Sequence, residues 1–107
     1  MAACLVYMTA ETPEAAQRIG RALVEARLAA CVNILGSISS IYRWEGEIVE
    51  DGETAFIAKT RDELVPALTA RVTELHSYDC PCVIALPVSG GNLSFLDWIA
   101  AETGAAP

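Results

Sequence analysis

Residues 40–48 constrain the fold more than any other part of this sequence. They place a Glu45-Gly46 pair between two long stretches of strand-forming residues, an arrangement typical of a β-hairpin. The stretches begin near Ala30 and end near Thr60, so the predicted hairpin reaches beyond what a small domain can cover. Exposed strand edges must be covered by another chain or protected by charge. The sequence therefore predicts assembly before it predicts chemistry.

The length and charge of the chain limit the possible fold and partners. A chain of 107 residues has room for one domain with one core, and we expect residues 1–107 to form it. Apolar residues make up 53% and charged residues 20%, a globular composition. The net charge of −7 would repel a polyanion, so we expect no nucleic-acid partner.

The N-terminal residues and the cysteines bear on location. Residues 1–8 are apolar but carry no basic group, and Glu11 ends the apolar run before the length of a signal peptide is reached. No segment approaches the length of a transmembrane helix, so we expect no membrane partner. Four cysteines without an export signal indicate reduced thiols, and we expect a cytoplasmic protein.

Two segments carry clear helix signals at their ends. Apolar residues at helical spacing predict a helix over residues 13–27, with Thr12 as its N-cap. A second amphipathic segment follows the last predicted strand. Asn92 or Ser94 is expected to cap it, and it should end near Gly104.

Two features of the sequence compete at the start of the central helix. Leucines and a valine at helical spacing run through residues 64–75. Thr60 resembles the first residue of a capping box, but Pro66 would then remove a hydrogen bond inside the helix. We therefore expect the regular helix to begin at Asp62 or later.

Four segments have the residue pattern of strands. They cover residues 1–8, 30–42, 47–60 and 82–88. Gly36 interrupts the second strand and is a candidate bulge, while Asp51-Gly52 in the third predicts either a second bulge or a true turn. Pro87 cannot donate to a sheet ladder, which favours an edge position for the fourth strand.

The order of these elements is β-α-β-β-α-β with an extra C-terminal helix. This order is typical of an α+β ferredoxin-like sandwich, in which two helices cover one face of an antiparallel sheet. Right-handed crossovers give the sheet order 4-1-3-2. The second and fourth strands should then lie at the two edges, with the long hairpin at one of them.

Five segments stand in a recognisable order and spacing: residues 29–34, 40–48 with its Tyr-x-Trp-Glu-Gly motif, 57–61, 83–88 and 98–99. Together they resemble a known family, the divalent-cation tolerance (CutA) proteins. The resemblance covers nearly the whole chain in order and spacing. It implies a homotrimer of ferredoxin-like subunits whose hairpins pair across subunit boundaries. It also implies a role in tolerance to copper and other divalent cations, and it brings no defined catalytic reaction.

The best metal-ligand candidates lie between residues 76 and 82. They are His76, Asp79, Cys80 and Cys82. The family's usual His-Pro-Tyr-Glu reads His-Ser-Tyr-Asp here, and Cys82 stands where relatives commonly carry an acidic residue. Cysteines two apart on a strand would share one face, and thiolates favour Cu(I) or Zn(II). We expect copper or another divalent metal ion as the bound metal, with none needed for folding. The alternative is that His76 ends a helix and Cys82 packs as a small apolar residue.

Two further sets of residues are expected near a cleft between subunits. Cys31 occupies the position of the family's recurrent cysteine, although a buried core thiol is the simpler interpretation. The remaining candidates are Tyr42, Trp44, Glu45, Glu47, Lys59 and Tyr78. They could line a polar cleft, or their aromatic and charged side chains could only stabilise strand pairing across a trimer.

The sequence lacks the features of an enzyme. The only histidine has no serine or cysteine partner fixed by a motif, and no glycine-rich phosphate loop occurs. The first hypothesis is therefore a non-catalytic homotrimer that binds metal ions. The alternative is a regulatory or interaction trimer, like the PII proteins in architecture, that binds a small effector in its intersubunit clefts.

Overall fold

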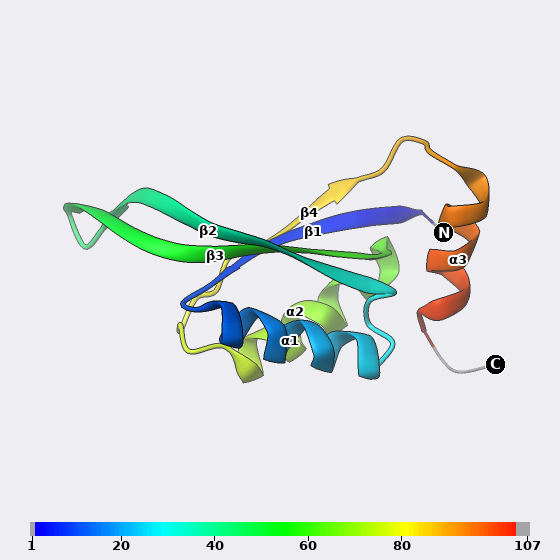
Figure 1. The fold of residues 1–107 in the computed structure, drawn as a ribbon, viewed down its shortest axis with the longest axis horizontal. Helices are drawn as coiled ribbons and strands as arrows, with labels where there is room; N and C mark the ends of the chain where they lie inside the picture. Colours follow the sequence, from blue (N-terminus) through cyan, green and yellow to red (C-terminus); the bar gives the residue numbers. More distant parts are fainter. Residues whose placement is uncertain (1, 105–107) are drawn as a thin grey trace.

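The computed structural model describes residues 2–104, which form one antiparallel sheet with two helices against one face (Figure 1). The elements are β1 Ala3–Ala10, α1 Pro13–Glu25, β2 Cys31–Trp44, β3 Glu47–Arg61, a short 3-10 turn Asp62–Leu64, α2 Val65–Leu75, β4 Val83–Pro87 and α3 Leu93–Glu102. The sheet order β2-β3-β1-β4 is the predicted 4-1-3-2 order viewed from the other edge. The ferredoxin-like α+β sandwich is therefore confirmed. Within residues 2–104, no helix has the length and apolar character to cross a membrane.

The hairpin of β2 and β3 is the longest feature of the molecule. Its two-residue turn has positive φ at both Glu45 (50°) and Gly46 (83°), the turn geometry that matches the twist of paired strands. β1 pairs only with residues 54–61 of β3. Residues 47–53 of β3 are thus bonded to β2 alone, so the distal half of the hairpin projects beyond the rest of the sheet (Figure 1).

A bulge in β2 decides which side chains face the helices. Ile34 pairs with Phe56 but Gly36 pairs with Ala55, so Leu35 is the extra residue, and Gly36 has φ of 123°. The predicted bulge is confirmed. Before it, even-numbered β2 residues lie on the helix-covered face with Phe56. After it, they lie on the opposite face, which we call the open face. Without the bulge, Tyr42 would point to the other side.

The Asp51-Gly52 prediction was wrong in both of its forms. The pairs Ser39–Gly52 and Ser40–Asp51 continue the register without a shift, and β3 passes straight through. The local preference of Asp-Gly for a turn is overridden because β2 supplies a continuous strand partner.

The start of α2 agrees with the argument from Pro66 and not with a capping box at Thr60. Thr60 belongs to β3, and its hydroxyl donates to the Leu28 carbonyl at 2.7 Å. A 3-10 turn follows, and α2 begins at Val65 with Pro66 in its first turn, where a missing N–H costs no helical bond. The expectation of a start at Asp62 or later is confirmed.

The other predicted elements differ from the structure by a few residues at their ends. Thr12 caps α1 by accepting from the Ala15 N–H at 3.1 Å, but the helix ends at Glu25. Asn92, rather than Ser94, caps α3. β4 pairs with β1 only, so its predicted edge position is confirmed.

The core lies between the sheet and the helices α1 and α2. Alternate residues of β1 and β3 point into it and are fully buried, and one side of each helix covers them. Its members include Val6, Met8, Phe56, Ala58, Ile19, Leu23, Leu68 and Val72. The open face has no such cover from α1 or α2, and this difference between the two faces determines where the functional site lies.

Arg27 fastens the end of α3 to the end of α1. Its guanidinium donates to the carbonyls of Gly104 at 3.0 Å and Ala101 at 2.9 Å, and it lies 3.8 Å from Glu102. We expect Arg27→Ala to lower the free energy of unfolding by about 1–2 kcal/mol, because charge-assisted bonds are lost. Chemical denaturation measures the change.

The matched control is Arg71→Ala, which removes only a surface pair with Glu74 at 3.7 Å. Such pairs contribute about 0–1 kcal/mol. If the two variants were equally stable, the contacts of Arg27 with α3 would not contribute to stability.

Candidate functional site

A cavity of about 400 Å³ lies where the hairpin meets the loop before β4. We call it the hairpin pocket. It is lined by Thr9, Tyr42, Trp44, Glu53, Tyr78, Asp79, Cys80 and Cys82. Thr9 comes from the end of β1, and the bulge brings two aromatic residues of β2 to the same face as Glu53 of β3. Residues 78–82 of the loop complete the wall.

Tyr78 joins the loop to the hairpin. Its hydroxyl donates to the Glu53 carboxylate at 3.1 Å. Burial, followed by the negative charges of Glu53, Glu11 and Asp51, raises the pKa of Tyr78 to about 12. The phenol therefore stays protonated at neutral pH, mainly because of its burial and additionally because of the carboxylates around it.

The two thiols of the pocket differ in environment. Cys82 is half-buried, and burial, helped by the charge of Glu53, raises the pKa of its thiol, while a hydrogen bond with Thr9 acts in the opposite direction. Cys80 is exposed. Both residues precede β4: Cys80 lies in a bend, and Cys82 lies in the irregular segment that follows the bend. The expectation of two thiols on one face of a strand was therefore wrong. The proline between them has no N–H to donate to a sheet ladder.

The structure brings only part of the predicted metal set together. Asp79, Cys80 and Cys82 line the hairpin pocket. His76 lies just outside, with both ring nitrogens close to backbone groups. Cys31 lies further along the sheet. It pairs with Lys59, which is four residues along β3 from the residue that pairs with Thr9. Within residues 2–104, no three His, Cys, Asp or Glu side chains are grouped to hold a metal ion. The predicted ligand set therefore stays a prediction.

The predicted cleft residues separate into two groups. Tyr42, Trp44 and Tyr78 line the hairpin pocket, and Glu47 lies opposite Trp44 near the turn. Lys59 lies near the far end of the sheet, with its ammonium 5.3 Å from the centre of the Phe95 ring. Within one chain, Lys59 is thus not part of the pocket.

Sequence reasoning missed Glu53 and Thr9. If side chains had been expected to alternate between the two faces without a break along β3, Glu53 would have been placed on the same face as Tyr42. Glu53 pairs with Ile38, and every second residue of β2 after Ile38 points to the same face as Ile38. The expected irregularity at Asp51-Gly52 hid this signal. Thr9 gave no sequence signal of its own.

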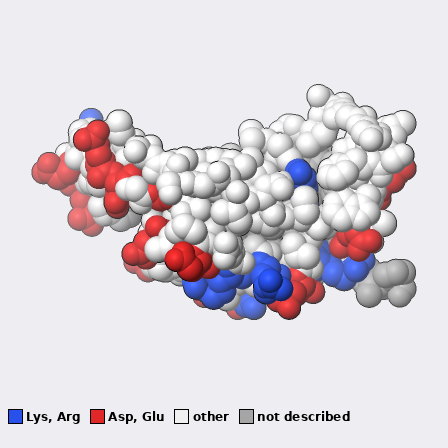
Figure 2. All heavy atoms as spheres, viewed as in Figure 1, with Lys and Arg blue, Asp and Glu red and all other residues white. Residues whose placement is uncertain are grey.

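The charges of the protein are unevenly distributed. Figure 2 shows acidic side chains gathered over the projecting end of the hairpin, while most of the basic groups visible lie along the helical side. Among the described residues that line the hairpin pocket there are two carboxylates and no lysine or arginine. The pocket therefore favours a cation over an anion.

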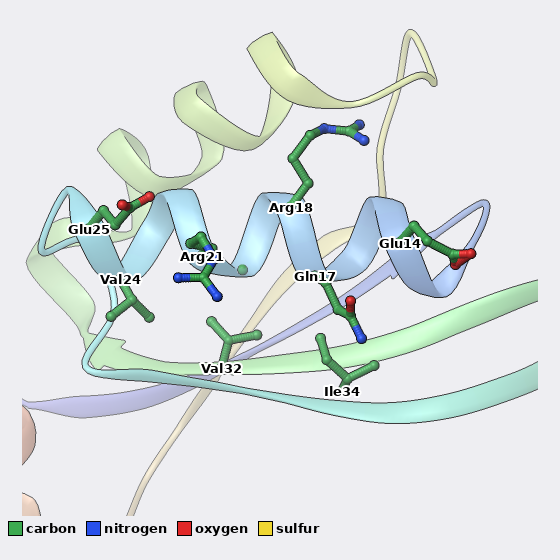
Figure 3. A pocket seen from close by; sticks show the side chains of 9 residues that line it. Glu14, Gln17, Arg18, Arg21, Val24, Glu25, Val32 and Ile34 are labelled. Carbon is green, nitrogen blue, oxygen red and sulfur yellow. The ribbon is translucent and has the colours of Figure 1, made fainter.

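A second groove lies between α1 and β2 and has a volume of about 540 Å³. In Figure 3, Gln17 and Arg21 point toward β2, Arg18 points away from it, and Glu14 and Glu25 stand near the two ends. Charges of both signs thus share an open surface, and no set of them converges on one point. The hairpin pocket is the better candidate site.

Comparison with known proteins agrees with this architecture. Residues 4–102 match the family model described as CutA1 divalent ion tolerance protein. The Divalent-cation tolerance protein CutA of Thermus thermophilus is 48% identical over 100 residues, which are 94% of this chain and 97% of the relative. A solved structure of a divalent cation tolerance protein from Thermus thermophilus has a TM-score of 0.93 at 47% identity and covers 95% of this chain and 99% of its own.

The relatives differ in length. Protein CutA of Homo sapiens is 48% identical over 93 residues, 87% of this chain, but the match covers only 52% of the human protein. The common part is the domain described above, with its hairpin and helices. The family match and these identities show that the chain belongs to the CutA1 divalent ion tolerance family.

Proposed function

We propose that this protein takes part in divalent-cation tolerance by binding a metal ion, copper included, in the hairpin pocket. The observation that carries the proposal is that Glu53, Asp79, Cys80 and Cys82 all line one cavity, which no described lysine or arginine lines. The charges that raise the pKa values of Tyr78 and Cys82 repel further negative charge. A bound cation would offset that repulsion.

The donor types fit a soft or borderline metal ion. Thiolates favour Cu(I) and Zn(II), whereas Mg²⁺ and Ca²⁺ prefer sites made of oxygen alone. Because no three such side chains are grouped within residues 2–104, water or a neighbouring subunit would supply the remaining ligands. We expect the metal to be the cargo of the protein rather than a requirement for folding.

The test is a titration of the reduced, metal-free protein with Cu(I), Cu(II) and Zn(II), with Mg(II) for comparison. We expect Cys82→Ser and Glu53→Gln each to weaken Zn(II) binding about tenfold or more, as substitutions in metal sites commonly do. Binding should be tighter at pH about 8 than at about 6, because the metal must displace a thiol proton. Competition with a chromophoric chelator measures the affinity.

Cys31→Ser is the matched control, since it removes a thiol that lies outside the hairpin pocket. Equal losses in Cys31→Ser and Cys82→Ser would contradict a site in this pocket. Weak binding that none of these changes affects would favour the alternative function, a PII-like trimer that binds a small effector.

We also propose a non-catalytic role. The ring of the only histidine contacts backbone groups through both nitrogens, so no imidazole is free to activate a thiol nucleophile.

A cytoplasmic location would suit the four cysteines, all of which are free thiols.

We further propose that the functional unit is a homotrimer. Ile84 and Leu86 of β4 are 54% and 48% exposed, and they pair with Tyr7 and Leu5 of β1 on the open face. Exposed apolar residues on one sheet face usually mark an interaction surface. The projecting half of the hairpin also has strand edges that a second subunit could cover.

A further inference from the structure

His76 makes two short contacts with the backbone on either side of its ring. Nε2 lies 2.8 Å from the carbonyl oxygen of Thr9, and the Tyr78 N–H donates to Nδ1 at 3.0 Å. We propose that His76 is a positioning residue that holds the loop of residues 76–82 against the end of β1, and not a metal ligand. This inference rests on the proposed metal-binding function of the hairpin pocket.

The two partners determine where the ring proton lies. A backbone N–H can only donate, so Nδ1 of His76 must carry the lone pair that accepts from Tyr78. The Thr9 carbonyl can only accept, so Nε2 must carry the hydrogen. The ring is therefore neutral, in the Nε2–H form, and both nitrogens are already used. A metal ion could bind either one only by displacing a backbone hydrogen bond.

His76 connects three parts of the molecule that the pocket needs in fixed positions. Its own N–H donates to the Val72 carbonyl at 2.9 Å, where α2 ends, and its ring fastens the loop to β1. Its ring centre lies 4.6 Å from that of Tyr78, whose hydroxyl reaches Glu53 on β3. The loop is thus tied to β1 through the imidazole of His76 and to β3 through Tyr78.

The loop that His76 fastens carries the pocket's thiols. Cys80 and Cys82 lie in the bend and the segment just after it, and no sheet ladder holds either of them. Cys82 is also held by its hydrogen bond with Thr9 and by the pairing of the next residue, Val83, with Met8. The contacts made by residues 76–78 add the support on the other side of the loop. Loss of such a supporting contact typically lowers metal affinity about 10–100-fold without removing a ligand.

The first test is a long-range ¹H–¹⁵N spectrum of the imidazole, which is unambiguous because the chain has one histidine. The metal-free protein at pH about 8, where a histidine ring is ordinarily neutral, should show the Nε2–H form. One equivalent of Zn(II) should leave this pattern unchanged. The Nδ1–H form in the metal-free protein, or a zinc-bound nitrogen after addition, would overturn the proposal.

The second test compares two substitutions. His76→Asn keeps a side-chain oxygen able to accept from the N–H two residues later, as in an Asx-turn, whereas His76→Ala has no acceptor. We expect His76→Ala to shift the Tyr78 resonances in metal-free protein and to weaken Zn(II) binding about tenfold, with His76→Asn recovering most of both. Circular dichroism confirms folding, and Ser77→Ala serves as the neighbouring control.

The outcomes separate this inference from the proposed function. If wild-type protein binds no Zn(II), the metal function fails, while the tautomer and the Tyr78 resonances still test the positioning role. If zinc binds and both His76 variants lose it equally, with Tyr78 unchanged, His76 is a ligand and the inference is wrong.

Discussion

Replacing Phe56 by alanine is expected to lower the free energy of unfolding by about 3–5 kcal/mol, the usual cost of removing a buried aromatic side chain. Phe56 is fully buried in β3, where it pairs with Ile34 on one side and Met8 on the other. Its ring lies next to the β2 bulge, which turns Tyr42 and Trp44 to the open face. The substitution should therefore disturb the hairpin pocket as well as the core.

Phe95→Ala is the matched control, because Phe95 is 42% exposed on α3 and is the only other phenylalanine. We expect it to cost less than half as much as Phe56→Ala. Denaturation with guanidinium at one fixed protein concentration gives both values, since assembly makes apparent stability depend on concentration. Equal costs would mean that the ring of Phe56 does not stabilise the core as its burial indicates.

The fold was predictable because its main signals are local or periodic. The Glu45-Gly46 turn and the break at Gly36 are fixed by backbone conformations that few residues adopt, and both were predicted correctly. Asp51-Gly52 was not, because its turn preference is weaker than the pairing of a long strand with β2. The start of α2 was constrained by Pro66, because a proline has no N–H to donate inside a helix and therefore disfavours an earlier start.

The site was less predictable because it depends on which face each strand residue occupies. His76, Asp79, Cys80 and Cys82 were found as a sequence cluster, and the last three of them do line one pocket, while His76 lies outside it. Glu53 was missed because its place on the open face follows only from an unbroken register. The contact of the His76 ring with Thr9 could not be predicted, since Thr9 is 67 residues away in the chain. Contacts of such long range have no local pattern.

The open face of the sheet leads to the second large expected effect, on assembly. β1 and β4 present Tyr7, Leu5, Ile84 and Leu86 there as neighbouring cross-strand pairs. The two β4 residues are about half exposed in the single chain. If a homotrimer buries this face, these side chains lose their contact with water when the subunits associate. An unpaired charge at the same positions would then make the free energy of association less favourable by several kcal/mol in each copy.

We therefore expect the double variant Ile84→Glu, Leu86→Glu to be a folded monomer, whereas the unmodified protein should have about three times the 11.4 kDa mass of one chain. Val24→Glu, which adds a charge at a 40% exposed position of α1 on the opposite side of the sheet, should leave the assembly intact. Light scattering after size exclusion measures the masses, and circular dichroism confirms folding. A monomeric unmodified protein at micromolar concentration would contradict the homotrimer. A double variant that still assembles would show that the open face is not the trimer interface, and the strand edges of the projecting hairpin would then be the next candidate surface for association.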